Sequence, residues 1–144
     1  MQQRKNRSAF TLVEVLIVVV IMAILAATII PQFTDSTNDA KESTSKFNLH
    51  TLRSQIELYK AHHNGAVPDP LTNLTVQTDV DGNPGTDFGP YVREIPENPF
   101  TNLNSVTATT ATATAPPAAA TGGGWLYNAT TGDIFIDYAG YLAE

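Results

Sequence analysis

A long apolar segment near the start of the chain limits what this protein can be. It covers residues 10–30 and reads FTLVEVLIVVVIMAILAATII, where two threonines and Glu14 are the exceptions to apolar character. As a helix it would span roughly 30 Å, at about 1.5 Å per residue, which matches the hydrocarbon core of a bilayer. We therefore expect residues 10–30 to form a membrane-spanning helix.

A basic segment, residues 1–9, precedes the apolar run. Its cations are Arg4, Lys5 and Arg7. Positive charge stays on the cytoplasmic side of a membrane, so the chain from Pro31 onward would lie on the other side. A secretory signal peptide is the alternative, but its apolar stretch is shorter and ends in a small-residue cleavage site, whereas Pro31 follows this one. The length of the run favours an anchor.

Glu14 is the one carboxylate inside the apolar run. A carboxylate deep in hydrocarbon costs roughly 2.5–3.5 kcal/mol on insertion scales. Glu14 could lie near the membrane interface, or it could meet a charge of opposite sign in an assembly. A free α-amine at Phe10 would be such a charge, and it would require the chain to be cut between Ala9 and Phe10.

The residues SAFTLVEVLIVVVIMAILAA resemble the type III leader and N-terminal helix of type IV pilins and type II secretion pseudopilins. In that family a basic leader ends in a small residue, Phe follows the cut, and Glu is the fifth mature residue. Ala9, Phe10 and Glu14 match these positions, although the family nearly always has Gly where this chain has Ala9. The resemblance implies that a prepilin peptidase cuts after Ala9 and N-methylates Phe10. It also implies that Glu14 sets the register of subunits by pairing with a neighbour's N-terminus.

Residues 31–64 continue the helix with an amphipathic pattern. Pro31 lacks an N–H and falls where the family often has a proline, so we expect a kink there. Four residues at spacings of three and four predict an apolar stripe, widened by Ala40 and Phe47. The stripe consists of Leu49, Leu52, Ile56 and Tyr59. Gly65 and Pro68 then predict the end of one long helix that runs from Phe10 to about His63.

Two charge pairs on this helix have the four-residue spacing that brings side chains together. They are Glu42–Lys46 and Arg53–Glu57. We expect both as ion pairs on the solvent side of the helix, where each adds a few tenths of a kcal/mol.

Residues 65–144 are expected to form the head of the molecule. Its acidic turn TDVDGNPGTD offers oxygen ligands of the kind that calcium prefers. The candidate ligands are Asp79, Asp81, Asn83 and Asp87. The spacing departs from an EF-hand, because Gly is not sixth and the final Glu is missing. An ordinary acidic turn is therefore the simpler interpretation, and calcium is the alternative.

The segment GPYVREIPENPF resembles the one that follows the helix in major pseudopilins. Its apolar residues are expected to pack on the long helix; they are Tyr91, Val92, Ile95 and Phe100. Residues 101–124 are rich in Thr and Ala and are expected to form an exposed, mobile loop, because they offer little apolar surface to bury. Residues 125–137 then predict a β-hairpin with a turn at Gly132.

These elements predict an α+β, pilin-like fold. One long N-terminal helix, with a transmembrane first half, would pack its second half against a small C-terminal antiparallel sheet with its loops. The expected segments are a leader (residues 1–9), a transmembrane or filament-core helix (residues 10–30), its amphipathic continuation (residues 31–64) and the head (residues 65–144).

The composition excludes several functions. There is no cysteine, and the net charge of −6 becomes about −9 from Phe10 onward, which gives no support for nucleic-acid binding. No nucleophile elbow, zinc-protease motif or phosphate loop is present, so we expect no enzyme activity. Apart from the calcium alternative, we expect no cofactor.

We expect a structural subunit of a helical filament, the pseudopilus of a type II secretion system. The resemblance implies as partners further copies of the chain, minor pseudopilins or pilins, the prepilin peptidase and an inner-membrane assembly platform, with membrane lipid around the helix before assembly. It places the chain in a bacterial inner membrane, single-pass, with a cytoplasmic N-terminus and a periplasmic or extracellular head. A type IV pilus pilin and a single-span binding protein with an acidic head are the alternatives.

Overall fold

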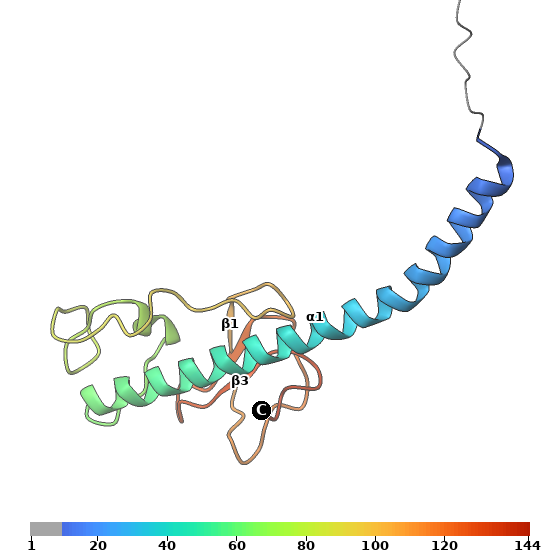
Figure 1. Cartoon of the computed structure of the whole chain (residues 1–144). Helices are drawn as coiled ribbons and strands as arrows, with labels where there is room; N and C mark the ends of the chain where they lie inside the picture. The colour runs from blue at the N-terminus through green and yellow to red at the C-terminus, as the bar shows by residue number, and fades with distance from the viewer. Residues whose placement is uncertain (1–9) are drawn as a thin grey trace, which may run out of the picture. The chain divides into compact units, whose positions relative to one another are not determined.

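The computed structural model of the chain describes residues 10–144, so the leader and Ala9 lie outside the described residues. Five elements follow one another along the chain (Figure 1). They are α1 (Leu12–His62), the 3-10 helix η1 (Leu71–Thr75), β1 (Val106–Ala108), β2 (Trp125–Tyr127) and β3 (Ile134–Ile136). The chain divides into two compact units, residues 1–39 and 40–144, and each is described by itself.

The long helix is confirmed, with bounds close to those expected from the sequence. α1 is assigned as one helix through Pro31, so the missing N–H does not end it. The kink at this proline stays a prediction. At the other end, Asn64 (φ 55°) and Gly65 (φ 87°) adopt left-handed backbone conformations. The N–H of Gly65 then donates to the carbonyl of Lys60 at 2.8 Å, which closes the last turn.

His63 fastens the end of α1 to the head. Its side chain is buried, and its ring stacks on Tyr59 with the centroids 3.7 Å apart. Nδ1 lies 2.7 Å from the carbonyl oxygen of Tyr59, and Nε2 lies 2.9 Å from the hydroxyl of Thr78. A carbonyl oxygen can only accept, so Nδ1 of His63 carries a proton and donates to Tyr59.

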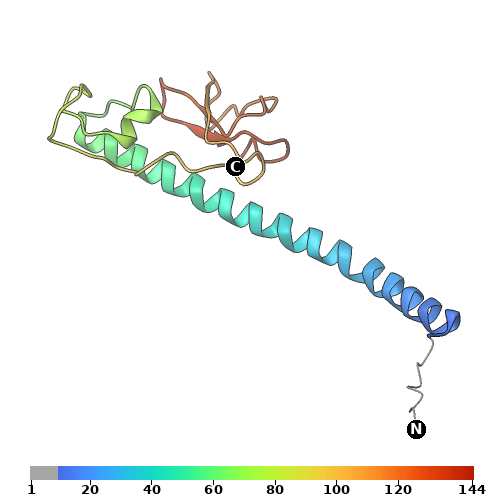
Figure 2. The ribbon, with the colours of Figure 1, turned by 90° about the horizontal axis from the view of Figure 1, so that it is seen from above.

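Within the second unit, the predicted apolar stripe of α1 forms one wall of the core. Leu49, Leu52, Ile56 and Tyr59 are buried, together with Ser45. The sheet and the loops lie along one side of this part of the helix (Figure 2). The expectation that Ala40 and Phe47 widen the stripe is wrong, because Ala40 is exposed and Phe47 is 71% exposed. Phe47 stands two residues from both Ser45 and Leu49, or about 200° around the helix.

The hairpin of the head is confirmed, and a third strand joins it. β2 and β3 pair antiparallel, with Trp125 opposite Ile136 and Tyr127 opposite Ile134. β1 pairs parallel to β2, so the sheet order is β1-β2-β3. The core side of the sheet carries four buried side chains, as expected: Trp125, Tyr127, Ile134 and Ile136. Ile95 is buried in the same core, and Tyr91, Val92 and Phe100 pack against it partly buried.

Residues 101–124 contain more structure than the sequence predicted. The expectation of a loop without order of its own is wrong for Val106–Ala108, which form β1. The following strap, residues 109–123, is held by the buried carboxylate of Asp137. This carboxylate accepts from the N–H of Thr121 at 2.6 Å, its hydroxyl at 2.5 Å, and the N–H of Gly123 at 2.6 Å.

Packing around the hairpin explains two further features of the sequence. Leu126 and Phe135 lie on the side of the hairpin away from the core, yet both are buried, and Leu126 lines a cavity together with strap residues. Glycine is needed at position 124 because a Cβ there would stand 2.3 Å from the carbonyl oxygen of Leu103. The small residues of the strap therefore cover the second face of the hairpin.

The expected pair Arg53–Glu57 is wrong, because Arg53 turns to the backbone of the head instead. It does not pair with Glu57, which instead bonds Lys60 at 2.8 Å. Its Nη2 donates to the carbonyl of Ile134 at 3.1 Å and to the backbone oxygen of Glu144 at 2.5 Å. The expected pair Glu42–Lys46 does form, at 3.0 Å. Arg53 thus connects α1 to β3 by hydrogen bonds and does not form the expected ion pair on the solvent side of the helix.

We predict that Leu52→Ala destabilises the head strongly. Leu52 is completely buried in the core, so the change should lower the free energy of unfolding by about 2–5 kcal/mol through lost burial and the cavity left behind. Urea unfolding of the full chain in detergent micelles, followed by Trp125 fluorescence, measures this. Phe47→Ala is the control on the same helix and should change stability by less than about 0.5 kcal/mol. Equal losses in both variants would contradict the assignment of the core.

We predict that Asp137→Ala releases the strap. The change leaves the N–H groups of Thr121 and Gly123 without their acceptor, which should cost about 1–3 kcal/mol. Limited proteolysis should then cut within residues 109–123 much faster than in the wild type. Asp137→Asn retains one acceptor oxygen and should give an intermediate rate. An unchanged cleavage rate in Asp137→Ala would show that the carboxylate does not hold the strap.

Candidate functional site

The N-terminus of α1 is closed by two side chains that cap it reciprocally. The backbone N–H and the hydroxyl of Thr11 both donate to Oε2 of Glu14, each at 2.8 Å. In return, the N–H of Glu14 donates to Oγ1 of Thr11 at 3.2 Å. This is a capping box, in which Thr is the N-cap and Glu is the third helical residue. Glu14 is therefore held in position by its own helix.

The capping box leaves part of the Glu14 carboxylate free. Both bonds from Thr11 end on Oε2, and within residues 10–144 no donor is assigned to Oε1. Oε1 could accept a hydrogen bond from an amine of a second chain without disturbing the cap. The predicted partner amine exists if the chain is cut before Phe10. Ala9 lies outside the described residues, so the cleavage site, the methylation of Phe10 and the register role of Glu14 stay predictions.

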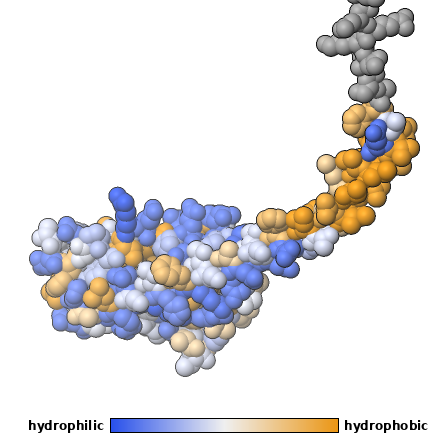
Figure 3. Space-filling model, viewed as in Figure 1, coloured by the Kyte–Doolittle hydropathy of each residue, from blue (hydrophilic) through white to orange (hydrophobic). Residues whose placement is uncertain are grey.

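The first part of α1 presents apolar side chains on all sides. From Phe10 to Ile30 its large apolar residues are 47–82% exposed. The space-filling view shows this part of the helix as almost continuously hydrophobic (Figure 3). By length and composition α1 could cross a membrane, near the N-terminus of the chain. So much apolar surface requires either lipid or other helices to cover it.

A second exposed surface follows the part of α1 in the head unit, on the side away from the core. We call it the outer face; it consists of the half-buried Thr51 and the exposed residues Ala40, Thr44, Phe47, Ser54 and Leu58. Its residues alternate spacings of four and three, which places them on one side of a helix. Phe47 is 71% exposed and Leu58 43% exposed. None of the six residues carries a charge.

The hydroxyls of the outer face are hydrogen-bonded to backbone carbonyls of α1 itself. Thr44 donates to the carbonyl of Ala40 at 2.8 Å, Thr51 to that of Phe47 at 2.9 Å, and Ser54 to that of His50 at 2.8 Å. Because these hydroxyls already have partners, burying them against a neighbour costs little desolvation. The outer face is thus suited to contact another apolar surface.

The acidic turn of the head is organised by Asp79. Its Oδ1 accepts from the N–H of Asp81 at 3.0 Å and from the N–H of Asn83 at 2.9 Å. The bond from the Asn83 amide, above all, holds the pKa of the Asp79 carboxyl below its ordinary value. This carboxylate therefore stabilises the turn by accepting hydrogen bonds from its backbone N–H groups.

The calcium hypothesis gains no support from this turn. Residues 10–144 contain no group of three or more His, Asp or Glu side chains arranged to hold a metal ion. Of the proposed ligands, Asp79 is occupied with backbone amides, while Asp81, Asn83 and Asp87 are exposed. Calcium binding by these four residues stays a prediction.

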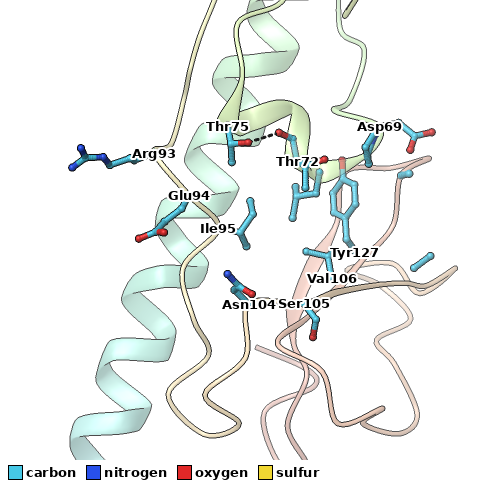
Figure 4. Close-up of a pocket in the computed structure, with 14 residues that line it drawn as sticks. Asp69, Thr72, Thr75, Arg93, Glu94, Ile95, Asn104, Ser105, Val106 and Tyr127 are labelled. Atoms are coloured by element: carbon cyan, nitrogen blue, oxygen red, sulfur yellow. Dashed lines mark hydrogen bonds between the residues drawn. The ribbon is translucent and has the colours of Figure 1, made fainter.

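A cavity of the head lies between η1, the segment 93–95 and β1. Its volume is about 540 Å³. The close-up shows Thr72 and Thr75 of η1 on one wall, with Val106 and Tyr127 from the sheet beside them and Ile95 directed inward (Figure 4). The hydroxyl of Tyr127 is not free, because it donates to the carbonyl of Pro68 at 2.8 Å. Burial raises the pKa of this phenol, so it stays protonated.

Thr11 was not predicted as a functional residue, although its sequence signal is present. Thr11 and Glu14 have the spacing T-x-x-E of a capping box, and an apolar run follows. Asp137 and the cavity were also missed, and no local pattern marks them. The partners of Asp137 stand 14 to 16 residues earlier in the chain, where a sequence gives no indication of contact.

Comparisons with known proteins agree with this geometry. Residues 4–30 match the family model described as the prokaryotic N-terminal methylation motif. Type II secretion system core protein G of Pseudomonas aeruginosa is 32% identical over 104 residues, covering 69% of this chain and 72% of the relative. The protein of the same name from Vibrio cholerae is 27% identical, covering 71% of each chain.

A relative with a different name matches a shorter stretch. The prepilin peptidase-dependent protein A of Clostridium perfringens is 31% identical over 81 residues, which is 56% of each chain. None of the solved structures matches the chain. The identity to the Pseudomonas protein extends well beyond the methylation motif and into the head. The chain belongs to the type II secretion system core protein G family.

Proposed function

We propose that this protein is a structural subunit of the pseudopilus, the helical filament of a type II secretion system. The observation that carries the proposal is the exposed apolar part of α1 with a capped Glu14 at its N-terminus, inside the segment that matches the methylation motif. The relatives are named as secretion-system core proteins, which supports a structural role rather than a catalytic one.

The precursor is held in the inner membrane by residues 10–30, with its basic leader in the cytoplasm and its head in the periplasm. A prepilin peptidase cuts after Ala9 and N-methylates Phe10. The name of the Clostridium relative, which refers to this peptidase, supports such processing. Lipid covers the apolar helix before assembly, and helices of neighbouring copies cover it afterwards. An assembly platform and minor pseudopilins act as further partners.

Glu14 sets the register of each incoming subunit. Its Oε2 stays in the capping box, while Oε1 accepts from the α-amine of Phe10 on a neighbouring subunit. Pairing this charge recovers much of the cost of burying it, whereas an incorrect register leaves a carboxylate unpaired among apolar side chains. Such a heterologous contact, repeated without closure, generates a helical filament.

The outer face of α1 extends the packed surface into the head. Heads of about the same negative charge repel one another, so contacts between copies are favoured where charge is missing. The outer face offers such a surface, with Phe47 and Leu58 available for burial. In this arrangement the whole length of α1 contributes to packing, and the sheet side of the head stays outside.

We predict that Glu14→Leu abolishes filament assembly while membrane insertion survives. The change removes the paired charge and also the insertion cost of roughly 2.5–3.5 kcal/mol. Filaments sheared from cells and pelleted by centrifugation measure assembly, and membrane fractionation measures insertion. Glu14→Gln is the matched variant, because it keeps an acceptor for Thr11 but not the charge, and it should also fail to assemble. Normal filaments from Glu14→Gln would contradict charge pairing as the cause.

We predict that Phe47→Glu reduces assembly without loss of head stability. The substitution places a charge on the outer face, where a second copy would have to bury it. Filament yield should fall at least tenfold, while the unfolding midpoint of the full chain in micelles stays within about 2 °C of the wild type. Glu57→Gln, which alters an exposed charge beside the outer face, is the control and should assemble normally. Normal assembly of Phe47→Glu would exclude the outer face from the contact.

A further inference from the structure

The sheet of the head has two outer edges, and they differ in one respect. On β3, the outward carbonyl of Ile134 accepts from Arg53 at 3.1 Å, and that of Ile136 accepts from the N–H of Tyr138 at 2.9 Å. These bonds occupy the two outward carbonyls of the β3 edge. An edge strand with unpaired backbone groups is a template for another strand, so natural proteins close or block such edges.

The edge of β1 is open. In its parallel pairing with β2, the N–H of Trp125 donates to Ser105, and the N–H of Thr109 donates to the carbonyl of Tyr127, both at 2.9 Å. Val106 and Ala108, which alternate with these residues, therefore direct their N–H and C=O groups away from β2. Within residues 10–144 none of these four groups has a hydrogen-bond partner.

The open edge borders the cavity of about 540 Å³, whose lining includes Val106 and Ala108. The inner surface of this cavity belongs to the core, because Leu71, Ile95 and Tyr127 are all buried there. The close-up shows Arg93 and Glu94 directed away from the space that Ile95 and Val106 enclose (Figure 4). The site therefore combines a row of free backbone groups with an apolar pocket, the two features that strand addition requires.

The sequence of the edge does not block pairing. Neither proline nor charge occurs from Thr101 to Ala115, in a region that lacks any charged residue from Asn98 to Gly132. The charged residues that line the cavity are Asp69, Arg93 and Glu94, and none of them belongs to β1. This distribution selects a neutral segment beside β1, because a charge there would have to be buried without a partner.

We propose that the β1 edge and its cavity form a docking groove for an uncharged, extended segment of a different protein, which adds to the sheet as a fourth strand. The free groups of Val106 and Ala108 bond its backbone, and the cavity takes one of its branched aliphatic side chains. This partner is separate from the copies that build a filament, so the proposal does not depend on filament assembly.

The strap of a second copy of this chain is a poor source of that segment. It makes a tight turn in which Thr112 and Ala115 exchange backbone hydrogen bonds at 3.0 and 2.9 Å. Pro116 and Pro117 follow directly and have no N–H to donate. β3 offers fewer free backbone groups than β1, because its outward carbonyls are bonded.

Amide hydrogen exchange on the full chain in detergent micelles tests the groove. In the free protein the amides of Val106 and Ala108 should exchange fast, while those of Thr107 and Thr109, bonded to β2, should be protected. The probe is the peptide acetyl-Thr-Val-Thr-Val-Thr-amide at about 1 mM, where it should slow exchange at Val106 and Ala108 at least tenfold. The same peptide with Glu in place of both valines should leave exchange unchanged.

The variant Ala108→Pro makes the test specific. It removes an N–H that faces the cavity and none that bonds β2, and proline is tolerated at such an edge position. Peptide-dependent protection of Val106 should disappear, while Thr107 stays protected as evidence that β1 is intact; Ala108→Ser should behave as the wild type. Unchanged exchange with the valine peptide, or equal protection by both peptides, overturns the proposal. If exchange at Val106 and Ala108 slows as the protein concentration rises in the absence of peptide, a second copy occupies the groove. This outcome overturns the assignment to a different protein.

Discussion

Burial of the stripe of α1 is the constraint on which the head depends. A sheet of three strands, each three residues long, cannot be stable alone, and its core-side residues need an apolar surface opposite them. Leu49, Leu52, Ile56 and Tyr59 provide that surface. The same helix continues towards the N-terminus with apolar residues that nothing in the chain's own unit buries. One element therefore supports the fold at one end and requires a partner at the other.

Polar contacts decide how the head sits on this wall. Arg53 connects α1 with β3, His63 connects the end of α1 with Thr78, and Asp137 holds the strap over the hairpin. Each uses a charged or polar side chain to satisfy backbone groups or hydroxyls that folding would otherwise bury without partners. Such contacts contribute little net stability but penalise alternative packings, because breaking one leaves a buried group unsatisfied.

The polar and the apolar surfaces of the molecule suit different kinds of partner. The first part of α1 and the outer face are apolar or neutral and suit other copies of the same chain. The open edge of β1 offers backbone groups and an apolar cavity, which suit an extended segment. The acidic surface around Asp81 and Asp87 is exposed. The neighbouring carboxylate of Asp79 accepts hydrogen bonds from backbone N–H groups of the same turn. A filament built from such subunits would hide the neutral helix and display the charged head.

The sequence by itself determined the long helix, its apolar stripe, the hairpin and the residues of the methylation motif, because each is encoded by local spacing. A period of 3.6 residues, a turn with Gly132 and a T-x-x-E cap are all visible within a few residues. Only the tertiary structure decided that residues 106–108 form β1, that Arg53 turns inward and that Phe47 is exposed. It also decided that Asp137 holds the strap and that a cavity forms beside β1. Arg53 and Ile134 stand 81 residues apart, and a contact of that kind depends on which surfaces the folded chain brings together. Local patterns thus specify the elements, whereas their hydrogen-bond partners are fixed by packing.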